Sequence, residues 1–309
     1  MDQKALQSEK LIGVEVSNSR LNAVSISEKD GILDNSSASL IKDEDLAPQL
    51  VKFISSLQIK FGDFDSIGIT VPGLIDRETK RVTFSSQHPE YENIDFLGEL
   101  EKVVKMNIYV ENDANAAAYG EYLFGAGRGS KNLFYVTLGS GIGGAFIFDG
   151  KLWRGASGFA GEFGYIAVNS DGMRLEEVAS SANIIRRTKT RFHQDPTSSL
   201  NEIGEESITI SDVVREANNG DDFARLMLER TGTYVGMAIA GVINLLNIEK
   251  IIIGGEIMQA GKLVLEGIKN RAQESSFSPN YNSTEIVQGK LGENAAAAGV
   301  AMLAKNNFV

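Results

Sequence analysis

The stretch Asn132–Gly155, NLFYVTLGSGIGGAFIFDGKLWRG, contains the pattern that decides how this chain folds. An apolar run leads into a tip of glycine and serine, and a second apolar run follows the tip directly. This alternation predicts two strands joined by a glycine-rich loop. Glycines let a ligand approach the backbone closely, and successive N–H groups in such a turn can bind an anion. A hairpin turn without a ligand explains the pattern equally well.

The loop does not have the context of the common nucleotide-binding motifs. In a dinucleotide-binding fingerprint a helix follows the glycines, whereas here AFIFDG (residues 145–150) is another predicted strand. The stretch also lacks the Gly-Lys-Ser/Thr of a Walker loop. A glycine loop in this setting is therefore a weak signal by itself.

A similar hairpin is predicted near the start of the chain. Leu11–Val16 and Leu21–Ile26 read as two strands, and the tip between them, SNSR at residues 17–20, contains no glycine. An apolar strand, a polar or glycine tip and a second apolar strand thus occur twice, near residues 16 and 139. Two related halves facing each other across a cleft would produce this repetition.

The remaining pattern alternates between predicted helices and short strands. Apolar residues at helical spacing predict helices at 46–61, 96–104, 111–127, 210–218, 223–246, 260–274 and 292–305. Buried strands are predicted at 66–76, where a Pro-Gly turn ends the strand, at 107–110 and at 250–257. The polar segment Phe192–Glu206 is predicted to be a flexible loop, and Trp153 is expected to pack beside the second hairpin.

Length and composition indicate an ordinary globular protein of two domains. The chain has 309 residues, of which 42% are hydrophobic and 23% charged. A net charge of -11 without a dense Lys/Arg run disfavours binding to nucleic acid or to an anionic membrane. The absence of cysteine excludes disulfides and thiolate chemistry. The polar start, MDQKALQSEK, and the lack of long apolar runs predict a cytoplasmic protein without a signal peptide.

Polar residues gather where the predicted strand at 107–110 meets the next helix. Glu111, Asn112 and Asp113 form a run there, and Asn115 follows just inside the helix. Ligand-binding groups collect at the ends of strands in α/β sheets. Helix capping by Asn112 or Asp113 is the alternative, although one cap accounts for only one of these residues. We therefore favour a functional site here.

Other candidate residues have less support from local sequence. Glu162 lies among glycines and apolar residues, where either a ligand or simple exposure in a turn explains it. Glu176 and Glu177 begin a predicted helix, where acidic residues suit the helix dipole. His88 and His193 fall in predicted loops without a ligand-spaced partner, so we expect surface positions for both.

Taken together, these segments resemble the ROK family of bacterial sugar kinases and repressors, within the actin-like ATPase superfamily. The segments that carry the resemblance are VPGLID, VENDANAAAYGE, TLGSGIGGAFIFDGKLWRGASGFAGEFGY and IIIGGEI, in the family's order and approximate spacing. The resemblance implies two actin-like (ribonuclease H-like) α/β domains around a central cleft. The smaller domain would comprise residues 1–112, with the C-terminal helix of about 294–309 packing back on it, and the larger domain residues 113–293.

The resemblance also implies roles for individual residues. Asp113 matches the catalytic base, and the hexose would be bound by Gly73, Asn112, Asp113, Glu162, Tyr165 and Glu176. ATP would be held by a first phosphate loop (Glu15, Ser17, Asn18, Ser19 and Arg20), a second one (Thr137, Gly139, Ser140 and Gly141) and the glycines near the adenosine (Gly254 and Gly255). Mg²⁺ would arrive with ATP, and Glu15 would orient it.

Three departures from the family pattern modify these expectations. Tyr165 replaces a histidine of the family's zinc site and the stretch to Glu176 has no cysteine, so we expect no structural zinc. The first phosphate loop retains an acid, a hydroxyl and a cation (Glu15, Ser19, Arg20) but no glycine, although Asn18 tolerates a left-handed turn. About ten residues precede the first strand, which leaves no room for the repressors' helix-turn-helix.

The leading hypothesis is an ATP-dependent hexose kinase, with glucose as the first substrate to test and a homodimer as the expected assembly. Phosphoryl transfer requires alignment and charge neutralisation, and a carboxylate can take the proton of the attacking hydroxyl. The alternative is a non-catalytic sugar-binding or regulatory protein whose phosphate loop is impaired. A DNA-binding repressor is the least favoured reading, because of the short N-terminus and the acidic charge.

Overall fold

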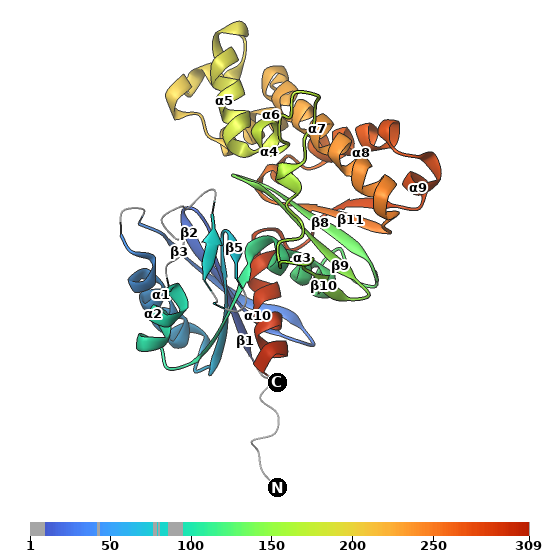
Figure 1. Cartoon of the computed structure of the whole chain (residues 1–309). Coiled ribbons are helices and arrows are strands. Elements are labelled where there is room, and N and C mark those ends of the chain that lie inside the picture. Colours follow the sequence, from blue (N-terminus) through green and yellow to red (C-terminus); the bar gives the residue numbers. More distant parts are fainter. Residues whose placement is uncertain (1–9, 42–43, 77–78, 80, 86–94, 309) are drawn as a thin grey trace. The chain divides into compact units, whose positions relative to one another are not determined.

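The computed structural model describes residues 10–41, 44–76, 79, 81–85 and 95–308, and these divide into two compact units. The first unit takes in the described residues of Met1–Arg128, Arg154–Phe159 and Glu293–Val309. The second comprises Gly129–Trp153 and Ala160–Gly292. Each unit has a five-stranded sheet with helices packed on it (Figure 1). The α/β class predicted from the sequence is confirmed.

The sheet of the first unit has the strand order β3-β2-β1-β4-β7. Its strands are β1 (Leu11–Val16), β2 (Arg20–Ser27), β3 (Gly31–Ser39), β4 (Ser66–Val71) and β7 (Asn107–Asn112). The first three strands form an antiparallel meander, and β4 and β7 continue the sheet in parallel with β1. A two-stranded ribbon, β5 (Leu74–Ile75) and β6 (Val82–Phe84), follows the Pro-Gly turn after β4.

Two pairs of helices cover the two faces of this sheet (Figure 1). They are α1 (Leu46–Phe61) and α2 (Phe96–Val103) on one face, and α3 (Asp113–Phe124) and α10 (Ala295–Phe308) on the other. Ile12, Val14 and Val16 of β1 lie in the core with α1. The alternate residue Gly13 faces α10, where a Cβ would overlap the carbonyl of Ala297. Glu15, two residues further on, therefore lies on the α10 side of the sheet.

The helix α3 lies after the domain boundary expected at residue 112, and it packs against α10 within the first unit. The two helix backbones approach closely because a Cβ at Gly299 would overlap the carbonyl of Ala116. The C-terminal helix therefore packs on the N-terminal sheet and on α3 together.

The sheet of the second unit repeats the topology of the first. Its order is β10-β9-β8-β11-β12, with the antiparallel strands on one side and the parallel strands on the other. The strands are β8 (Leu133–Leu138), β9 (Ile142–Phe148), β10 (Lys151–Trp153), β11 (Lys250–Gly254) and β12 (Glu285–Gln288). In each unit a β-hairpin is thus continued by two parallel strands, which confirms the repetition seen in the sequence.

The helices of the second unit contribute most of its core. They are α4 (Glu176–Ala179), α5 (Ser181–Arg191), α6 (Ile210–Asn219), α7 (Asp222–Leu246), α8 (Lys262–Ser275) and α9 (Ser278–Asn282). The backbones of α7 and α8 pack closely through glycines, since a Cβ at Gly236 would overlap the carbonyl of Ile268. None of the helices within the described ranges has the length and apolar character needed to span a membrane.

The predicted hairpins and long helices agree with the structure, and the differences concern polar or very short segments. Strands β3 and β12 and helix α5 were not predicted, because their sequences are too polar or too short to show a clear period. The segment Phe192–Glu206 was predicted to be a flexible loop, and this is wrong. It contains 3₁₀ turns and is anchored by the buried Leu200 and by a hydrogen bond from the Ser199 N–H to Asp221.

The predicted positions of the aromatic and histidine residues can also be compared with the structure. Trp153 packs edge-on against Phe146 and Phe148 of the second hairpin, as predicted. His193 is at the surface, as predicted, whereas His88 lies outside the described residues.

Candidate active site

The junction between β7 and α3 combines a helix cap with a pair of polar side chains. The Asn112 side chain caps α3 by accepting a hydrogen bond from the Asn115 N–H at 3.1 Å. Its amide group donates to the Gly73 carbonyl and to the Asp113 carboxylate, both at 3.0 Å. The capping alternative is therefore correct for Asn112. Three predicted substrate-binding residues, Gly73, Asn112 and Asp113, are brought together here.

The Asp113 carboxylate is in a favourable electrostatic environment for a base. Burial raises the pKa of this carboxyl above its ordinary value, while hydrogen bonds from the Ala114 N–H and from Asn112 act in the opposite direction. A raised pKa increases the affinity of a carboxylate for a proton, which is what a general base requires.

Gly73 has φ 132°, so the turn that accepts the Asn112 bond depends on a glycine.

Glu15 lies near Asp113 on the same side of the first sheet. The pKa of Glu15 is raised from 4.5 to about 8, mainly by burial and next by the neighbouring Asp113 carboxylate. Arg20 and the Asn22 side chain lower it, but they do not compensate. At pH 7 the Glu15 side chain is therefore largely protonated in the protein alone.

The tip between β1 and β2 is a tight turn that is held by a serine side chain and the backbone, without a positive φ angle. Both the Ser17 N–H and its hydroxyl donate to the Arg20 carbonyl at 3.0 Å. Among the described residues only Asp149 and Asn247 have positive φ without being glycine. Asn18 therefore does not adopt the left-handed conformation considered from the sequence. The exposed side chains of this tip are Asn18 and Ser19.

Arg20 at the end of this tip is held by the start of the C-terminal helix. Its guanidinium pairs with Glu293 at 2.5 Å, and the neighbouring Asn22 donates to the Glu293 carbonyl at 2.8 Å. Glu293 lies in the 3₁₀ turn Gly292–Asn294, which leads into α10, and is 273 residues from Arg20 in the sequence. The cation of the predicted first phosphate loop is thus already paired with a carboxylate.

The tip between β8 and β9 is held mainly through its backbone. The Gly139 N–H donates to the Gly141 carbonyl at 3.0 Å, and the Gly139 carbonyl accepts from the Ser181 N–H at 2.8 Å. The Ile142 N–H donates to the Glu176 carboxylate at 2.8 Å. Glu176, predicted as a sugar-binding residue, therefore also supports the predicted second phosphate loop.

The two glycines at the end of β11, Gly254 and Gly255, lie beside this second tip. Gly254 pairs with Thr137 in the sheet register. Gly255 has φ 91°, and a Cβ on it would overlap the carbonyl of Leu138. The predicted residues Thr137, Gly139, Ser140, Gly141, Gly254 and Gly255 therefore form one group in the second unit.

Glu162 immediately precedes a short 3₁₀ turn, Phe163–Tyr165, and Tyr165 is the last residue of this turn. Both side chains are exposed, which agrees with the alternative that Glu162 is a turn residue. The Arg174 guanidinium lies over the Tyr165 ring at 4.4 Å, and the chain between them closes through a hydrogen bond from the Val168 N–H to the Met173 carbonyl. A cation–π contact and a short hairpin thus stabilise the stretch in which the family has its zinc site.

The described residues offer no protein-built metal site. Within them, no group of three or more His, Cys, Asp or Glu side chains is arranged to hold a metal ion. Glu15, the residue expected to orient Mg²⁺, is largely protonated at pH 7, and a protonated carboxyl is a poor metal ligand. The absence of a structural zinc remains a prediction.

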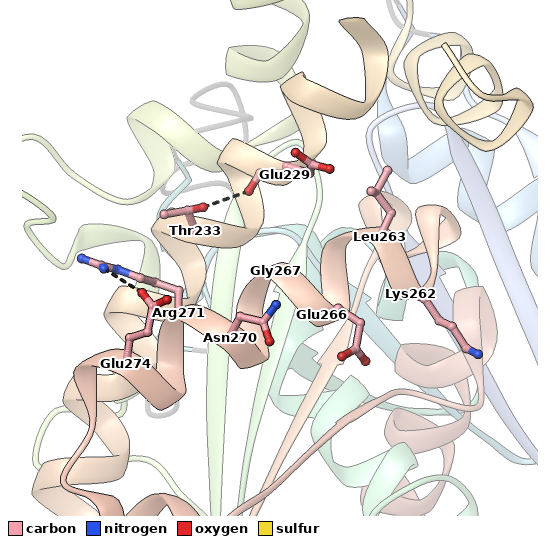
Figure 2. A pocket seen from close by; sticks show the side chains of 9 residues that line it. All are labelled: Glu229, Thr233, Lys262, Leu263, Glu266, Gly267, Asn270, Arg271 and Glu274. Carbon is pink, nitrogen blue, oxygen red and sulfur yellow. Dashed lines mark hydrogen bonds and ion pairs between the residues drawn. The ribbon is translucent and has the colours of Figure 1, made fainter. Parts of the chain in front are cut away.

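A groove of about 570 Å³ lies elsewhere in the second unit, between α7 and α8 (Figure 2). Its lining combines acidic and basic side chains, including an ion pair between Arg271 and Glu274 at 3.2 Å. None of the predicted site residues lines this groove.

Sequence reasoning missed four side chains that support the site, namely Glu293, Ser181, Glu256 and Arg154. Glu293 holds Arg20, and Ser181 donates to Glu256 at 2.6 Å beside Gly139. Arg154 pairs with Glu111 at 2.6 Å next to Asn112. Each has a partner far away in the sequence, so no local pattern could have identified these contacts.

Comparison with known proteins adds independent information. The family model described as "ROK family" matches residues 11–307. A glucokinase from Thermotoga maritima is 31% identical over 97% of this chain and 98% of its own length. A xylose repressor from Bacillus subtilis is 27% identical over 90% of this chain and 70% of its own length.

Among solved structures, a ROK family glucokinase from Streptomyces griseus in complex with glucose and AMPPNP is similar over nearly the whole chain. It matches with a TM-score of 0.85 and 28% identity, covering 96% of this chain and 99% of that one. The relatives thus include both sugar kinases and a transcriptional repressor.

Proposed function

The chain belongs to the ROK family, and we propose that it is an ATP-dependent hexose kinase. The reaction transfers the γ-phosphoryl group of ATP to a sugar hydroxyl, with glucose as the first substrate to test and glucose 6-phosphate as the expected product. The observation that carries this proposal is the Asn112–Asp113 pair at the end of β7, where the carboxylate has a raised pKa. The glucokinase relatives support the same function.

Asp113 acts in this proposal as the general base. As the hydroxyl oxygen forms its bond to phosphorus, the hydroxyl proton passes to the Asp113 carboxylate, and the bond between phosphorus and ADP breaks. Asn112 holds this carboxylate by donating to it at 3.0 Å, while its second bond, to the Gly73 carbonyl, limits its rotation. The pair thus orients the base relative to the turn at Gly73.

The remaining predicted residues bind the two substrates. Glu162, Tyr165 and Glu176 contribute hydrogen-bonding groups for hydroxyls of the hexose. The backbone N–H groups around Gly139–Gly141 bind phosphate, and Thr137, Gly254 and Gly255 line the side of this loop where the nucleotide is held. At the first tip, Ser17, Asn18, Ser19 and Arg20 complete the phosphate contacts, and Glu15 would orient the Mg²⁺ of the nucleotide.

Mg²⁺ would be bound together with ATP. A divalent cation near Glu15 lowers the pKa of that carboxyl, so arrival of the nucleotide would allow Glu15 to ionise. We further propose a cytoplasmic homodimer that needs neither nucleic acid nor a membrane for this activity.

A second candidate is a non-catalytic, sugar-responsive regulatory protein. The altered first tip favours it, because the Arg20 guanidinium is already paired with Glu293, which leaves this tip poorly prepared for phosphate. The similarity to a xylose repressor favours it as well.

Turnover and binding measurements separate the two candidates. An ADP-release assay with glucose, mannose, fructose, N-acetylglucosamine and N-acetylmannosamine should show turnover on at least one sugar. Asp113→Asn should lower kcat by a factor of about 10²–10⁴ while calorimetry still detects the sugar. Absence of turnover on every sugar, or full activity of the Asp113→Asn variant, contradicts the kinase. Sugar binding without binding of Mg-ATP supports the regulatory protein.

A further inference from the structure

Glu111 is a buried carboxylate that the proposed reaction does not use. The residue is only 6% exposed and lies one position before Asn112. One carboxylate oxygen, Oε2, accepts from Arg154 at 2.6 Å and from the Tyr109 hydroxyl at 3.0 Å. The other, Oε1, accepts from the Asn112 N–H and from the Asn115 side chain, both at 3.2 Å. All four bonds lie within the first unit.

The two bonds to Oε1 bracket the proposed base. Asn112 and Asn115 lie on either side of Asp113, and the Asn115 N–H in turn donates to the Asn112 side chain. Glu111 therefore connects the last residues of β7 with the first turn of α3. A displacement of this carboxylate would move the backbone that carries Asp113.

The hydrogen bond from Arg154 to Oε2 connects the same carboxylate to a segment that is distant in the sequence. Arg154 begins Arg154–Phe159, a segment that belongs to the first unit although the chain on both sides of it belongs to the second. Its side chain is largely buried, and its ion pair with Glu111 anchors the segment beside the β7–α3 junction. The chain then continues directly to Gly161 and Glu162.

We propose that Glu111 and Arg154 are positioning residues, which hold Asn112 and Asp113 in place and dock the segment Arg154–Phe159 beside them. This inference rests on the proposed kinase function. A buried ion pair adds little net stability compared with apolar residues of the same size, whereas removal of one partner leaves a costly unpaired charge. Catalytic groups, by contrast, require orientation to within about 0.5 Å, and a fully bonded carboxylate can provide it.

A double-mutant cycle separates positioning from stability. Glu111→Gln should lower kcat about tenfold or more at an unchanged KM for ATP, because the amide cannot accept bonds at all four positions. Arg154→Met should lower both kcat and the melting temperature, since it leaves the Glu111 carboxylate buried and unpaired. In the double variant the charge is removed, so the melting temperature should recover while kcat remains low.

The control is Lys305→Met, which removes another ion pair of the first unit, with Glu28 at 3.0 Å. It should retain the kcat of the wild type. A double variant that recovers kcat together with the melting temperature overturns the proposal, as does a Glu111→Gln variant with wild-type kcat.

Hydrogen–deuterium exchange tests the inference without reference to turnover. Glu111→Gln should accelerate exchange of amides in the first turn of α3 and in residues 154–159, relative to both the wild type and Lys305→Met. Unchanged exchange in these segments would overturn the positioning role. A wild type without turnover on any hexose would instead contradict the kinase, and the exchange measurement would still decide the role of Glu111.

Discussion

The two hairpin tips occupy the same place in two sheets of the same strand order, but they are held in different ways. The tip at Gly139–Gly141 is fixed by backbone hydrogen bonds and by the close approach of Gly255. The tip at residues 17–19 is fixed by a serine side chain and is flanked by ionisable groups, with Arg20 paired with Glu293 and Glu15 near Asp113. We therefore expect the glycine tip to be sensitive to added volume, and the polar tip to be sensitive to charge and pH.

The largest effect is expected from a methyl group beside the glycine tip. Gly255→Ala places a Cβ against the carbonyl of Leu138 at φ 91°, so we expect a loss of about 3 kcal/mol or more in the free energy of unfolding. Gly129→Ala is the control, because Gly129 also has positive φ but no atom lies within 4 Å of the added Cβ. It should cost about 1 kcal/mol. Similar losses in both variants, measured by urea unfolding, would contradict the volume argument.

The next effect concerns the pH dependence at the polar tip. Since the pKa of Glu15 is about 8 in the folded chain against an ordinary 4.5, its stabilising contribution is complete below pH 4.5 and is lost as pH rises through 8. The free energy of unfolding of the wild type should therefore decline between pH 5 and 8. We expect Glu15→Gln to make this decline smaller by about 1–2 kcal/mol. This is less than the full pKa shift implies, because solvent reaches the side chain.

The matched control for Glu15 is Glu101→Gln on the exposed surface of α2. This variant should keep the slope of the wild type. The same slope in all three proteins, obtained from urea unfolding at several pH values, would show that Glu15 titrates normally.

Removal of the cation tests whether the polar tip still handles phosphate. Arg20→Met should raise the KM for ATP about tenfold, which corresponds to the loss of one charge-assisted contact. The ion pair with Glu293 is exposed, with side chains 40% and 58% accessible, so stability should change by less than about 1 kcal/mol. Lys305→Met, which breaks another exposed pair, should leave the KM for ATP unchanged. An unaltered KM for ATP in Arg20→Met would mean that this tip is a structural turn and does not bind phosphate.

The smallest effect is expected within the glycine tip itself. A Cβ on Gly139 meets no atom closer than 3.8 Å, and its φ is not positive, so Gly139→Ala should change stability by less than about 0.5 kcal/mol. Because the methyl group would intrude where a phosphate approaches the backbone, we expect the KM for ATP to rise about threefold. Kinetics and unfolding measured on the same preparation check both statements. A destabilised variant would mean that the tip is packed more tightly than these distances indicate.

Much of the fold could be predicted because its signals are local. The hairpins, α1 and the helix after Asp113 follow from apolar periodicity and from turn residues within short windows. Strand β3 escaped prediction because its exposed, polar face shows no alternation, and the segment Phe192–Glu206 was mistaken because distant partners such as Asp221 order it. Sequence reasoning also placed Asn112 and Asp113 at a strand end, where the structure has them.

The sequence by itself determined the family, the α/β class, the repeated hairpin and the position of Asp113 after a buried strand. Only the tertiary structure decided what surrounds these residues. It paired Arg20 with Glu293 across 273 positions, Arg154 with Glu111 across 43 and Ile142 with Glu176 across 34. The physical reason is that backbone conformation is encoded by near neighbours, whereas the charge and the orientation of a buried side chain depend on groups that only folding brings within hydrogen-bonding distance.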